Sequence, residues 1–544
     1  MKKNIFVLMS SVLVLGAALA GCGGNSTAPA PTEPGKAAEA PKGDPKVVKI
    51  NLHSEPPTAD PGLAEDATSG AVIRATYDGL TRTDAEAKPQ NSVAQDIKIS
   101  DDKKTYTFTL RDSKWSNGEP VTAHDFEFAW KRALSKELAS NYAYQLYYIK
   151  NGEKYNKGEV PADQVGIKAT DDKTLVVELE NPTPFFLELT SFYTYFPVNK
   201  KLVESNKTWA NEAATIVSNG PFKMTEWQHK SKLVLEKNEH YWDKDTVKLD
   251  KLEFAMVEDE NSELAMFQNG ELDWAGHPTG MIPLDAIKPL KDSNELKVNP
   301  KASIYWYKFN TDKEPFNNAK IRKAFAYAIN RQEVVDNVTQ AGQLPALGML
   351  PPSMAYKKEG FFKDGDAETA KKLLEEGMKE MGWSKLPPVT LSFNTAESHK
   401  KIAEAIQDQW KKNLGVDVKL ENAEWKVYLD KLHEGNYQVG RMGWNADFND
   451  PINYIEMFKD KKGGNNDTNW ENAEYKQLVN DANKETDIAK RADMLKKAEE
   501  IFMDEMPLAP IYYSTDTWVQ NPKFTGVILD SLGNIDWKWA DITK

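Results

Sequence analysis

Thiol groups are almost absent from this sequence of 544 residues, which contains a single cysteine, Cys22. One cysteine excludes a disulfide within the chain and leaves no thiolate cluster to hold a metal ion. The 7 histidines form no His-Glu-x-x-His pattern of a zinc protease. A Gly-x-Ser-x-Gly turn, a P-loop and a dinucleotide fingerprint are also missing. These absences argue against the common hydrolases and nucleotide-dependent enzymes, and they predict no metal and no cofactor.

Positive charge is in the minority, with 69 Lys and Arg against 82 Asp and Glu and a formal net charge of -13. A surface this acidic does not favour nucleic acid or anionic lipid headgroups. Long apolar runs are also missing after the N-terminal segment, where nothing approaches the ~18 consecutive apolar residues of a membrane-spanning helix. Any attachment to a membrane is therefore expected to come from the start of the chain.

The N-terminal segment has the pattern of a signal peptide. Lys2 and Lys3 precede a mostly apolar run, Ile5–Ala20, which is short for a membrane span and typical of a signal peptide. The run ends in Leu-Ala-Gly-Cys, which resembles a bacterial lipobox, in which the cysteine becomes the lipid-modified first residue. We expect residues 1–21 to be removed and Cys22 to be lipidated. Ordinary cleavage near Ala20, with Cys22 left free, is the alternative.

Residues 22–45 are rich in Gly, Pro, Ala, Ser and Thr and have few large apolar side chains. Such a segment buries too little surface to offset the entropy of ordering. We expect it to be a flexible tether that holds the folded body away from the membrane.

Apolar and polar residues alternate in several segments of the first half, as in strands with one buried face. Gly and Pro separate these segments, for example in Asn117-Gly118-Glu119-Pro120. Asp125–Leu134 instead places Phe126 and Trp130 on one side of a helix. The expected strands are Val47–Leu52, Thr105–Leu110, Thr174–Leu179 and Leu233–Leu235.

Helical and strand patterns alternate in the second half, which predicts an α/β domain with parallel strands. A helix is expected over Asn318–Thr339, with Asn318 as its cap. Ligands of such sheets bind beyond the carboxyl ends of the strands, and the loop after Arg441 lies at one such end. The later elements expected are a strand at Val389–Asn394, a helix near Ser398–Asn413, a strand at Val416–Leu420, a helix near Trp425–His433 and a strand at Tyr437–Arg441.

Four stretches, in the same order and spacing, resemble the substrate-binding lipoproteins of bacterial oligopeptide ABC permeases, of the Gram-positive type (extracellular solute-binding protein family 5). The last of them, Gly-Arg-Met-Gly-Trp-Asn-Ala-Asp-Phe-Asn-Asp-Pro, is similar to the oligopeptide branch in particular. The stretches are Ser54–Pro61, Lys114–Phe126, Ile321–Arg331 and Gly440–Pro451.

The resemblance implies an α/β fold of the bilobal periplasmic-binding-protein-like type (type II, cluster C), with an additional domain on the first lobe. The implied boundaries are lobe I at 46–68, the additional domain at 69–195, lobe I again at 196–300, lobe II at 301–514 and a C-terminal return to lobe I at 515–544. It also implies a lipid-anchored monomer on the extracytoplasmic face of the cell membrane. Such a protein is not an enzyme; it passes short peptides to the permease subunits of an ABC importer.

A binder of many peptides must hold what all peptides share, and an enclosed ammonium needs a carboxylate partner. By resemblance Asp447 is that partner, although an aspartate before Asn449-Asp450-Pro451 also suits a turn cap. The peptide main chain is expected to pair with backbone near Glu55 and with Arg441–Asn445, which includes Gly443. A solvated loop acid is the other interpretation of Glu55.

Aromatic and basic residues complete the site that the resemblance implies. Tyr142, Trp425 and Trp444 match ligand-contacting aromatics, although either tryptophan could belong to a core. Arg441 and His399 match positions near the peptide carboxylate, although a histidine at a helix start is often a solvated group. Two positions depart from the enterobacterial pattern: Asn445 stands in place of a cysteine and Leu432 in place of an arginine.

Three other functions stay open from the sequence. A binder of nickel chelates, sugars or another small solute would share the fold. Ser-x-x-Lys occurs at Ser100–Lys103 and Ser398–Lys401, as in penicillin-binding enzymes, but the partner motifs Ser-Asp-Asn and Lys-Thr-Gly are absent. A receptor or chaperone that captures peptides for signalling is the third alternative.

Overall fold

Segments of alternating apolar residues from both halves of the chain meet in one mixed sheet of eleven strands. The computed structural model describes residues 44–543, and the elements from Pro45 onward belong to one unit. The signal peptide, Cys22 and nearly all of the predicted tether lie outside the described residues. Between residues 44 and 543, no helix has both the length and the apolar character needed to span a bilayer.

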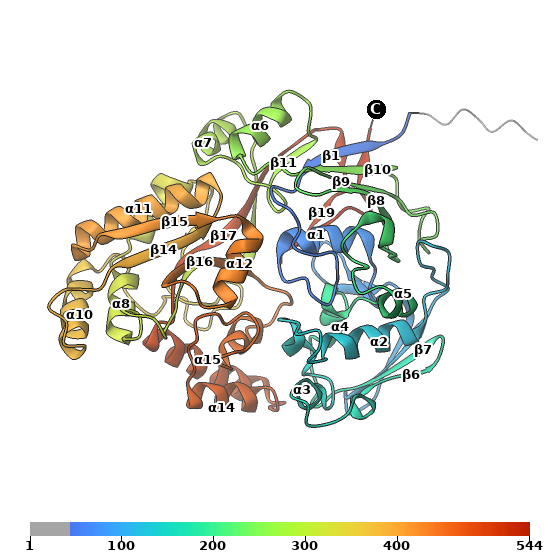
Figure 1. The fold of residues 1–544 in the computed structure, drawn as a ribbon, viewed down its shortest axis with the longest axis horizontal. Helices are drawn as coiled ribbons and strands as arrows, with labels where there is room; N and C mark the ends of the chain where they lie inside the picture. The colour runs from blue at the N-terminus through green and yellow to red at the C-terminus, as the bar shows by residue number, and fades with distance from the viewer. Residues whose placement is uncertain (1–43, 544) are drawn as a thin grey trace, which may run out of the picture. The chain divides into compact units, whose positions relative to one another are not determined.

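The strands of this sheet divide between two lobes (Figure 1). The first lobe is built on β1 (Val47–Asn51), β8 (Phe222–Gln228), β9 (Lys232–Lys237), β10 (Lys251–Ala255) and β11 (Trp274–Gly276). The second lobe is built on β12 (Lys297–Phe309), β14 (Val389–Asn394), β15 (Val418–Ala423) and β16 (Val439–Asn445).

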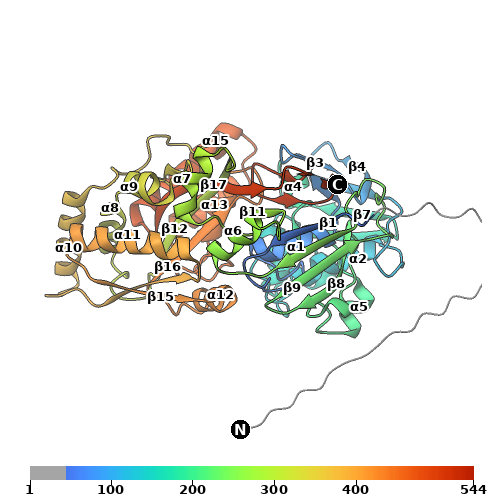
Figure 2. The ribbon, with the colours of Figure 1, turned by 90° about the horizontal axis from the view of Figure 1, so that it is seen from above.

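The long strand β17 (Leu508–Gln520) joins the two lobes. It pairs with β12 from Leu508 to Trp518, and its last residues also pair with β11, where Trp518 lies opposite Gly276. Figure 2 shows this strand in red, running from the second lobe into the first. Because one continuous strand belongs to both lobes, bending of β17 is a route by which they can open and close.

The predicted parallel arrangement is correct for only part of the sheet. β14 runs parallel to β15 and to β16, and β1 runs parallel to β10 and β11. β12, however, runs antiparallel to both β16 and β17. The sheet is therefore mixed, because a long strand that returns between the lobes is inserted among the parallel ones.

Helices of the second lobe follow the predicted order, with one exception. α11 (Glu397–Leu414) and α12 (Trp425–His433) lie where helices were expected. The helix expected over Asn318–Thr339 is instead broken into α8 (Ala319–Tyr327), α9 (Arg331–Val334) and a π-helical turn. The break occurs because the Asn330 side chain accepts a hydrogen bond from the Glu333 amide and starts a new helix.

A separate four-stranded antiparallel sheet lies within residues 94–178, in the order β4 (Ala94–Ile99), β5 (Thr105–Leu110), β7 (Thr174–Glu178), β6 (Ile167–Asp171). The helix α2 (Ala123–Ala133) begins with a capping box of Thr122 and Asp125 and buries Phe126 and Trp130. This sheet falls in the stretch for which the additional domain is predicted. The boundaries of the lobes and of this domain stay a prediction.

Candidate functional site

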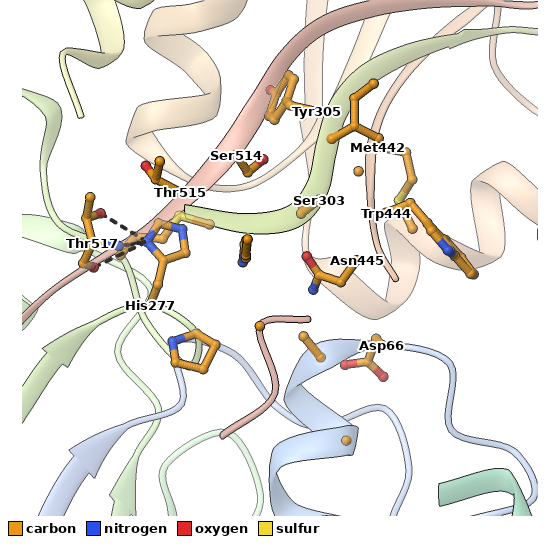
Figure 3. Close-up of a pocket in the computed structure, with 18 of the residues that line it drawn as sticks. Asp66, His277, Ser303, Tyr305, Met442, Trp444, Asn445, Ser514, Thr515 and Thr517 are labelled. Atoms are coloured by element: carbon orange, nitrogen blue, oxygen red, sulfur yellow. Dashed lines mark hydrogen bonds between the residues drawn. The ribbon is translucent and has the colours of Figure 1, made fainter. Parts of the chain in front are cut away.

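A cavity of about 280 Å³ lies between the lobes, near the lower end of the range for small-ligand sites. Its walls come from the segment around α1 (Ala67–Thr76) in the first lobe and from β12, β16 and the start of α11 in the second (Figure 3). Eight of the nine residues predicted to bind peptide line it: Tyr142, His399, Trp425, Arg441, Gly443, Trp444, Asn445 and Asp447.

One edge of β16 is free where it faces this cavity. β16 pairs with β12 along its whole length, from Val439 to Asn445. On its other edge, β14 reaches only Val439 and Gly440. Tyr428 donates to the Arg441 carbonyl, so the segment Met442–Asn445 keeps a strand edge with no strand partner in the described chain. Such an edge can accept an extended main chain as an added strand.

Gly443 lies where β16 comes very close to the backbone of β12. A Cβ atom at this position would come 3.0 Å from the Ile304 carbonyl oxygen on β12. Glycine therefore allows the close pairing of β16 with β12. The strand was predicted to end at Arg441, and this is wrong by four residues, since the pairing with β12 continues to Asn445.

The Asp447 carboxylate lies just past this strand and is held by neutral donors only. Gln145 Nε2 donates to it at 2.7 Å, Asn453 Nδ2 at 3.1 Å and the Tyr142 hydroxyl at 3.3 Å. No ion pair links Asp447 to a cation within residues 44–543. Its carboxylate accepts no backbone N–H from the described part of the chain and therefore does not cap the following turn.

Burial raises the pKa of Asp447 to about 7, and the hydrogen bonds from Asn453 and Tyr142 oppose this rise. An acid in such surroundings is destabilised in its charged form unless a cation meets it. The Asp447 site is therefore suited to a ligand that brings its own positive charge.

Arg441, at the other end of the free edge, is a cation without a paired acid in the described part of the chain. Its guanidinium donates to the Asn394 side chain at 3.1 Å and lies 4.6 Å from the centre of the Tyr305 ring. Lys301 also lines the cavity but is paired with Asp516 at 2.6 Å. Arg441 is thus available to a ligand carboxylate.

His399 lies in the first turn of α11 and is buried, with 4 % exposed. Burial, together with the charge of Arg441, lowers its pKa well below the usual value. His399 is therefore neutral at pH 7 and can offer a ligand carboxylate one N–H but no positive charge. Of the two residues expected near the peptide carboxylate, only Arg441 can therefore supply a positive charge.

The aromatic residues of the prediction form one wall of the cavity. The Tyr142 and Trp444 rings lie 6.0 Å apart, and the Trp444 indole donates to Asn453 at 3.0 Å. Asn453 thus orients both Trp444 and Asp447. Trp425 is half-buried at the start of α12 and stacks near Tyr428. Both tryptophans line the cavity while also packing against core residues.

Asn445 and Leu432, the two positions that depart from the enterobacterial pattern, differ in their relation to the cavity. Figure 3 shows the Asn445 side chain in the space between β16 and Asp66 at the start of α1. Leu432 is fully buried with Tyr428 and Tyr437 and does not line the cavity. A cavity wall therefore carries Asn445, whereas Leu432 contributes to packing under α12.

Glu55 is the predicted residue that the structure does not bring into the cavity lining. Its carboxylate contacts His229 Nδ1 at 2.7 Å and accepts from the Lys230 amide at 2.5 Å. These contacts fix a loop of the first lobe. A role for the backbone near Glu55 stays a prediction.

Several residues that line the cavity, or that hold the residues lining it, were not anticipated from the sequence. Gln145 and Asn453 lie in short helical segments with no motif around them. Tyr305 belongs to an apolar strand that reads as core, and Arg74 ends a helix of small residues. An isolated arginine on an otherwise uncharged helix is the one signal that could have drawn attention. The other residues that line the cavity include Glu65, Asp66, Phe192, Tyr193, His277 and Tyr512.

Two lobes that share a sheet and enclose a charged cavity are typical of bilobal solute-binding proteins. A family model described as bacterial extracellular solute-binding proteins, family 5 Middle, matches residues 88–466. The chain belongs to this family. It is 56% identical over 496 residues to the oligopeptide-binding protein OppA of Bacillus subtilis (strain 168), with 90% of this chain and 91% of that protein covered.

Solved structures agree with this assignment. Listeria monocytogenes OppA bound to peptide matches with a TM-score of 0.86 and 32% identity, covering 92% of this chain and 100% of that one. The Escherichia coli murein tripeptide binding protein MppA matches with 0.87 and 30% identity, covering 92% and 99%. Its unliganded open form, at 30% identity and 92% and 98% coverage, matches with only 0.62. The lobes of the present structure are therefore in a closed arrangement.

Proposed function

We propose that this protein captures short oligopeptides by their main chain and α-amino group and delivers them to an ABC importer. The observation that carries the proposal is the free edge of β16, which lies between an acid without a cation and a cation without an acid. Asp447 would hold the peptide ammonium and Arg441 its carboxylate. The similarity to OppA of Bacillus subtilis and to Listeria monocytogenes OppA bound to peptide supports it.

These contacts depend only on groups that every peptide has. The added strand provides main-chain hydrogen bonds, while side chains would point alternately into the cavity and its waters. Specificity for sequence would therefore be low. Closure of the lobes would bury the peptide and present a surface of both lobes to the permease.

The spacing of the two charges suggests a preferred length. Six residue steps separate Arg441 from Asp447, or roughly 20 Å at about 3.3 Å per step in a strand. Both side chains line the cavity, so the distance left for a ligand between them would be shorter. A peptide of about three to five residues would fill this span with both termini paired.

Isothermal titration calorimetry of the mature protein with alanine-based peptides of two to seven residues tests the proposal. We expect saturable binding that is strongest within the proposed length range. The same peptides with an acetylated N-terminus and an amidated C-terminus are the matched control and should bind far more weakly. Equal binding of blocked and free peptides, or no binding, would exclude the proposed mode. Mass spectrometry of the peptides after incubation checks the further proposal that the protein hydrolyses nothing.

We also propose that Cys22 anchors the mature protein to the outer face of the cell membrane as a monomer. The Leu-Ala-Gly-Cys sequence after the apolar run supports this, as does the extracellular character of the family. Cys22→Ser should abolish incorporation of radiolabelled palmitate and release the protein from the membrane fraction. Palmitate labelling that survives Cys22→Ser would contradict the proposal.

A further inference from the structure

Helix α1 carries one charged residue, and it faces the cavity. Asp66 caps the helix, and Ala67, Gly70 and Ala71 line the cavity at helical spacing. Arg74 follows one turn after Gly70 and also lines the cavity. The small residues leave space along this wall, so the guanidinium is the first large polar group that a ligand side chain meets there.

Arg74 is nearly buried, with 9 % exposed, yet no acid among residues 44–543 forms an ion pair with it. Of its five N–H groups, the guanidinium places one near the Ser191 carbonyl oxygen, at 3.4 Å. It lies 6.0 Å from the Phe192 ring centre. Burial lowers its pKa. Asp530 and Asp536 act on this charge electrostatically, but neither forms an ion pair with the guanidinium.

Arg82, a second buried arginine, has a full set of acidic partners within the fold. Its guanidinium makes two bonds to Asp536, at 2.6 and 2.8 Å, and one to Asp78. Asp530, the acid with the largest electrostatic effect on Arg74, accepts hydrogen bonds from Leu532 and Asn534. Arg74 therefore differs from Arg82 in having no ion pair with an acid in the described residues.

Arg74 lies near the end of the cavity assigned to the peptide amino terminus. Its charge acts on Asp447 and opposes the rise of the Asp447 pKa. Tyr193, which lines the cavity, stands 5.9 Å from the Tyr142 ring, and Tyr142 in turn contacts Asp447. The other acids at this end have partners of their own: Glu65 is paired with His433, and Asp66 accepts a hydrogen bond from the Ser69 amide.

The geometry points to Arg74 as a specificity-determining residue: it favours peptides with a carboxylate side chain on one of their first two residues. This inference rests on the proposed function and adds a charge preference to it. The ammonium of such a peptide neutralises Asp447, and its side-chain carboxylate supplies the partner that Arg74 lacks. A guanidinium can hold that carboxylate through two parallel hydrogen bonds.

Calorimetry with tripeptide pairs tests the preference. The pairs are Glu-Ala-Ala with Gln-Ala-Ala, Ala-Glu-Ala with Ala-Gln-Ala, and Ala-Ala-Glu with Ala-Ala-Gln. For the unchanged protein, the glutamate peptide should bind about tenfold more tightly than its glutamine partner at position one or two. In Arg74→Met this ratio should fall to about one, and Arg74→Lys should keep only part of it. Arg441→Met, as the matched control, should weaken both members of a pair and leave their ratio unchanged.

A ratio near one at both positions in the unchanged protein would overturn the inference, as would an unchanged ratio in Arg74→Met. If Arg74→Met does not fold, as judged by circular dichroism, the ratio in Arg74→Lys decides, and a ratio equal to that of the unchanged protein overturns the inference. Binding of no peptide at all would instead reject the proposed function, so the two failures are distinguishable.

Discussion

His433 Nε2 lies 2.9 Å from Glu65 Oε1, and this contact joins α12 of the second lobe to the loop before α1 of the first lobe. On the other side of the ring, His433 Nδ1 lies 2.7 Å from Asp467 Oδ1. Burial alone would lower the pKa of His433, but the hydrogen bonds to Asp467 and Glu65 outweigh it and raise the pKa to about 10. His433 is therefore charged at neutral pH and attracts an acid of the opposite lobe when the lobes close.

Glu65→Gln should weaken peptide binding, because the closed form loses its ion pair with His433 while the open form loses nothing. Exposure of these side chains is 15% and 22%, so we expect about 1 kcal/mol, or roughly a fivefold rise in Kd. Calorimetry measures the affinity, and small-angle scattering shows whether the unliganded protein is more open. Glu127→Gln, which breaks the Lys131 pair within one domain, is the control and should leave the affinity unchanged. Equal affinities for the unchanged protein, Glu65→Gln and Glu127→Gln would show that Glu65 does not stabilise the closed form.

Asp447→Asn should selectively reduce the binding of peptides with a free amino terminus. The substitution keeps the size and most hydrogen bonds of the side chain but removes the charge that the ammonium needs. Loss of one partner of a buried charged pair costs about 2–5 kcal/mol, so Kd should rise at least thirtyfold. N-acetylated versions of the same peptides, titrated into both proteins, should lose little. A similar loss for free and acetylated peptides would mean that Asp447 only supports the loop.

Peptide binding should release a proton near neutral pH. In the closed arrangement without ligand, burial raises the pKa of Asp447 to about 7, and a bound ammonium favours the charged carboxylate. Affinity should therefore rise as pH increases from about 5 to 7, and fall above about 8, where the peptide amine loses its proton. For the stability of the closed form without ligand the sign is opposite: because the pKa of this carboxyl is raised, that form becomes less stable as pH rises from about 4 to 7.

Titrations at pH 6.5 in buffers of different ionisation enthalpy count the protons released on binding. We expect release by the unchanged protein and none by Asp447→Asn. The same proton count in both would show that another group titrates on binding.

Local patterns predicted several elements to the residue. The strand Val389–Asn394, the helix Trp425–His433 and the strand Thr105–Leu110 have the bounds that their periodicity indicates. The breaks and extensions were not predictable in this way. Asn330 fits the helical spacing but acts as a cap, and β16 continues past Arg441 because β12, far away in the sequence, supplies its partner.

In the candidate site, too, residues within a local motif were predictable, whereas residues brought together by tertiary packing were not. Asp447 and Arg441 came from a resemblance within one contiguous stretch, and the structure places both at the cavity. Gln145, which holds Asp447, is 302 residues away in the sequence and carries no local signal. Arg74 was not predictable either, since the absence of an ion pair with Asp530 or Asp536 depends on where these two acids lie after folding. Such contacts follow from tertiary packing and leave no periodicity in the chain.

Arg441→Met should weaken the binding of peptides with a free carboxyl terminus, by an amount that depends on ligand length. Arg441 is the cavity cation best placed for that carboxylate, since Lys301 is paired with Asp516 and His399 is neutral. Methionine keeps the apolar contact with Tyr305 but removes the charge. The loss should be greatest, about tenfold or more, for the length whose carboxylate reaches residue 441, and small for shorter and longer peptides. Amidated peptides of the same lengths are the control and should bind both proteins alike. A loss of equal size at every length would mean that Arg441 shapes the cavity and does not pair with the ligand terminus.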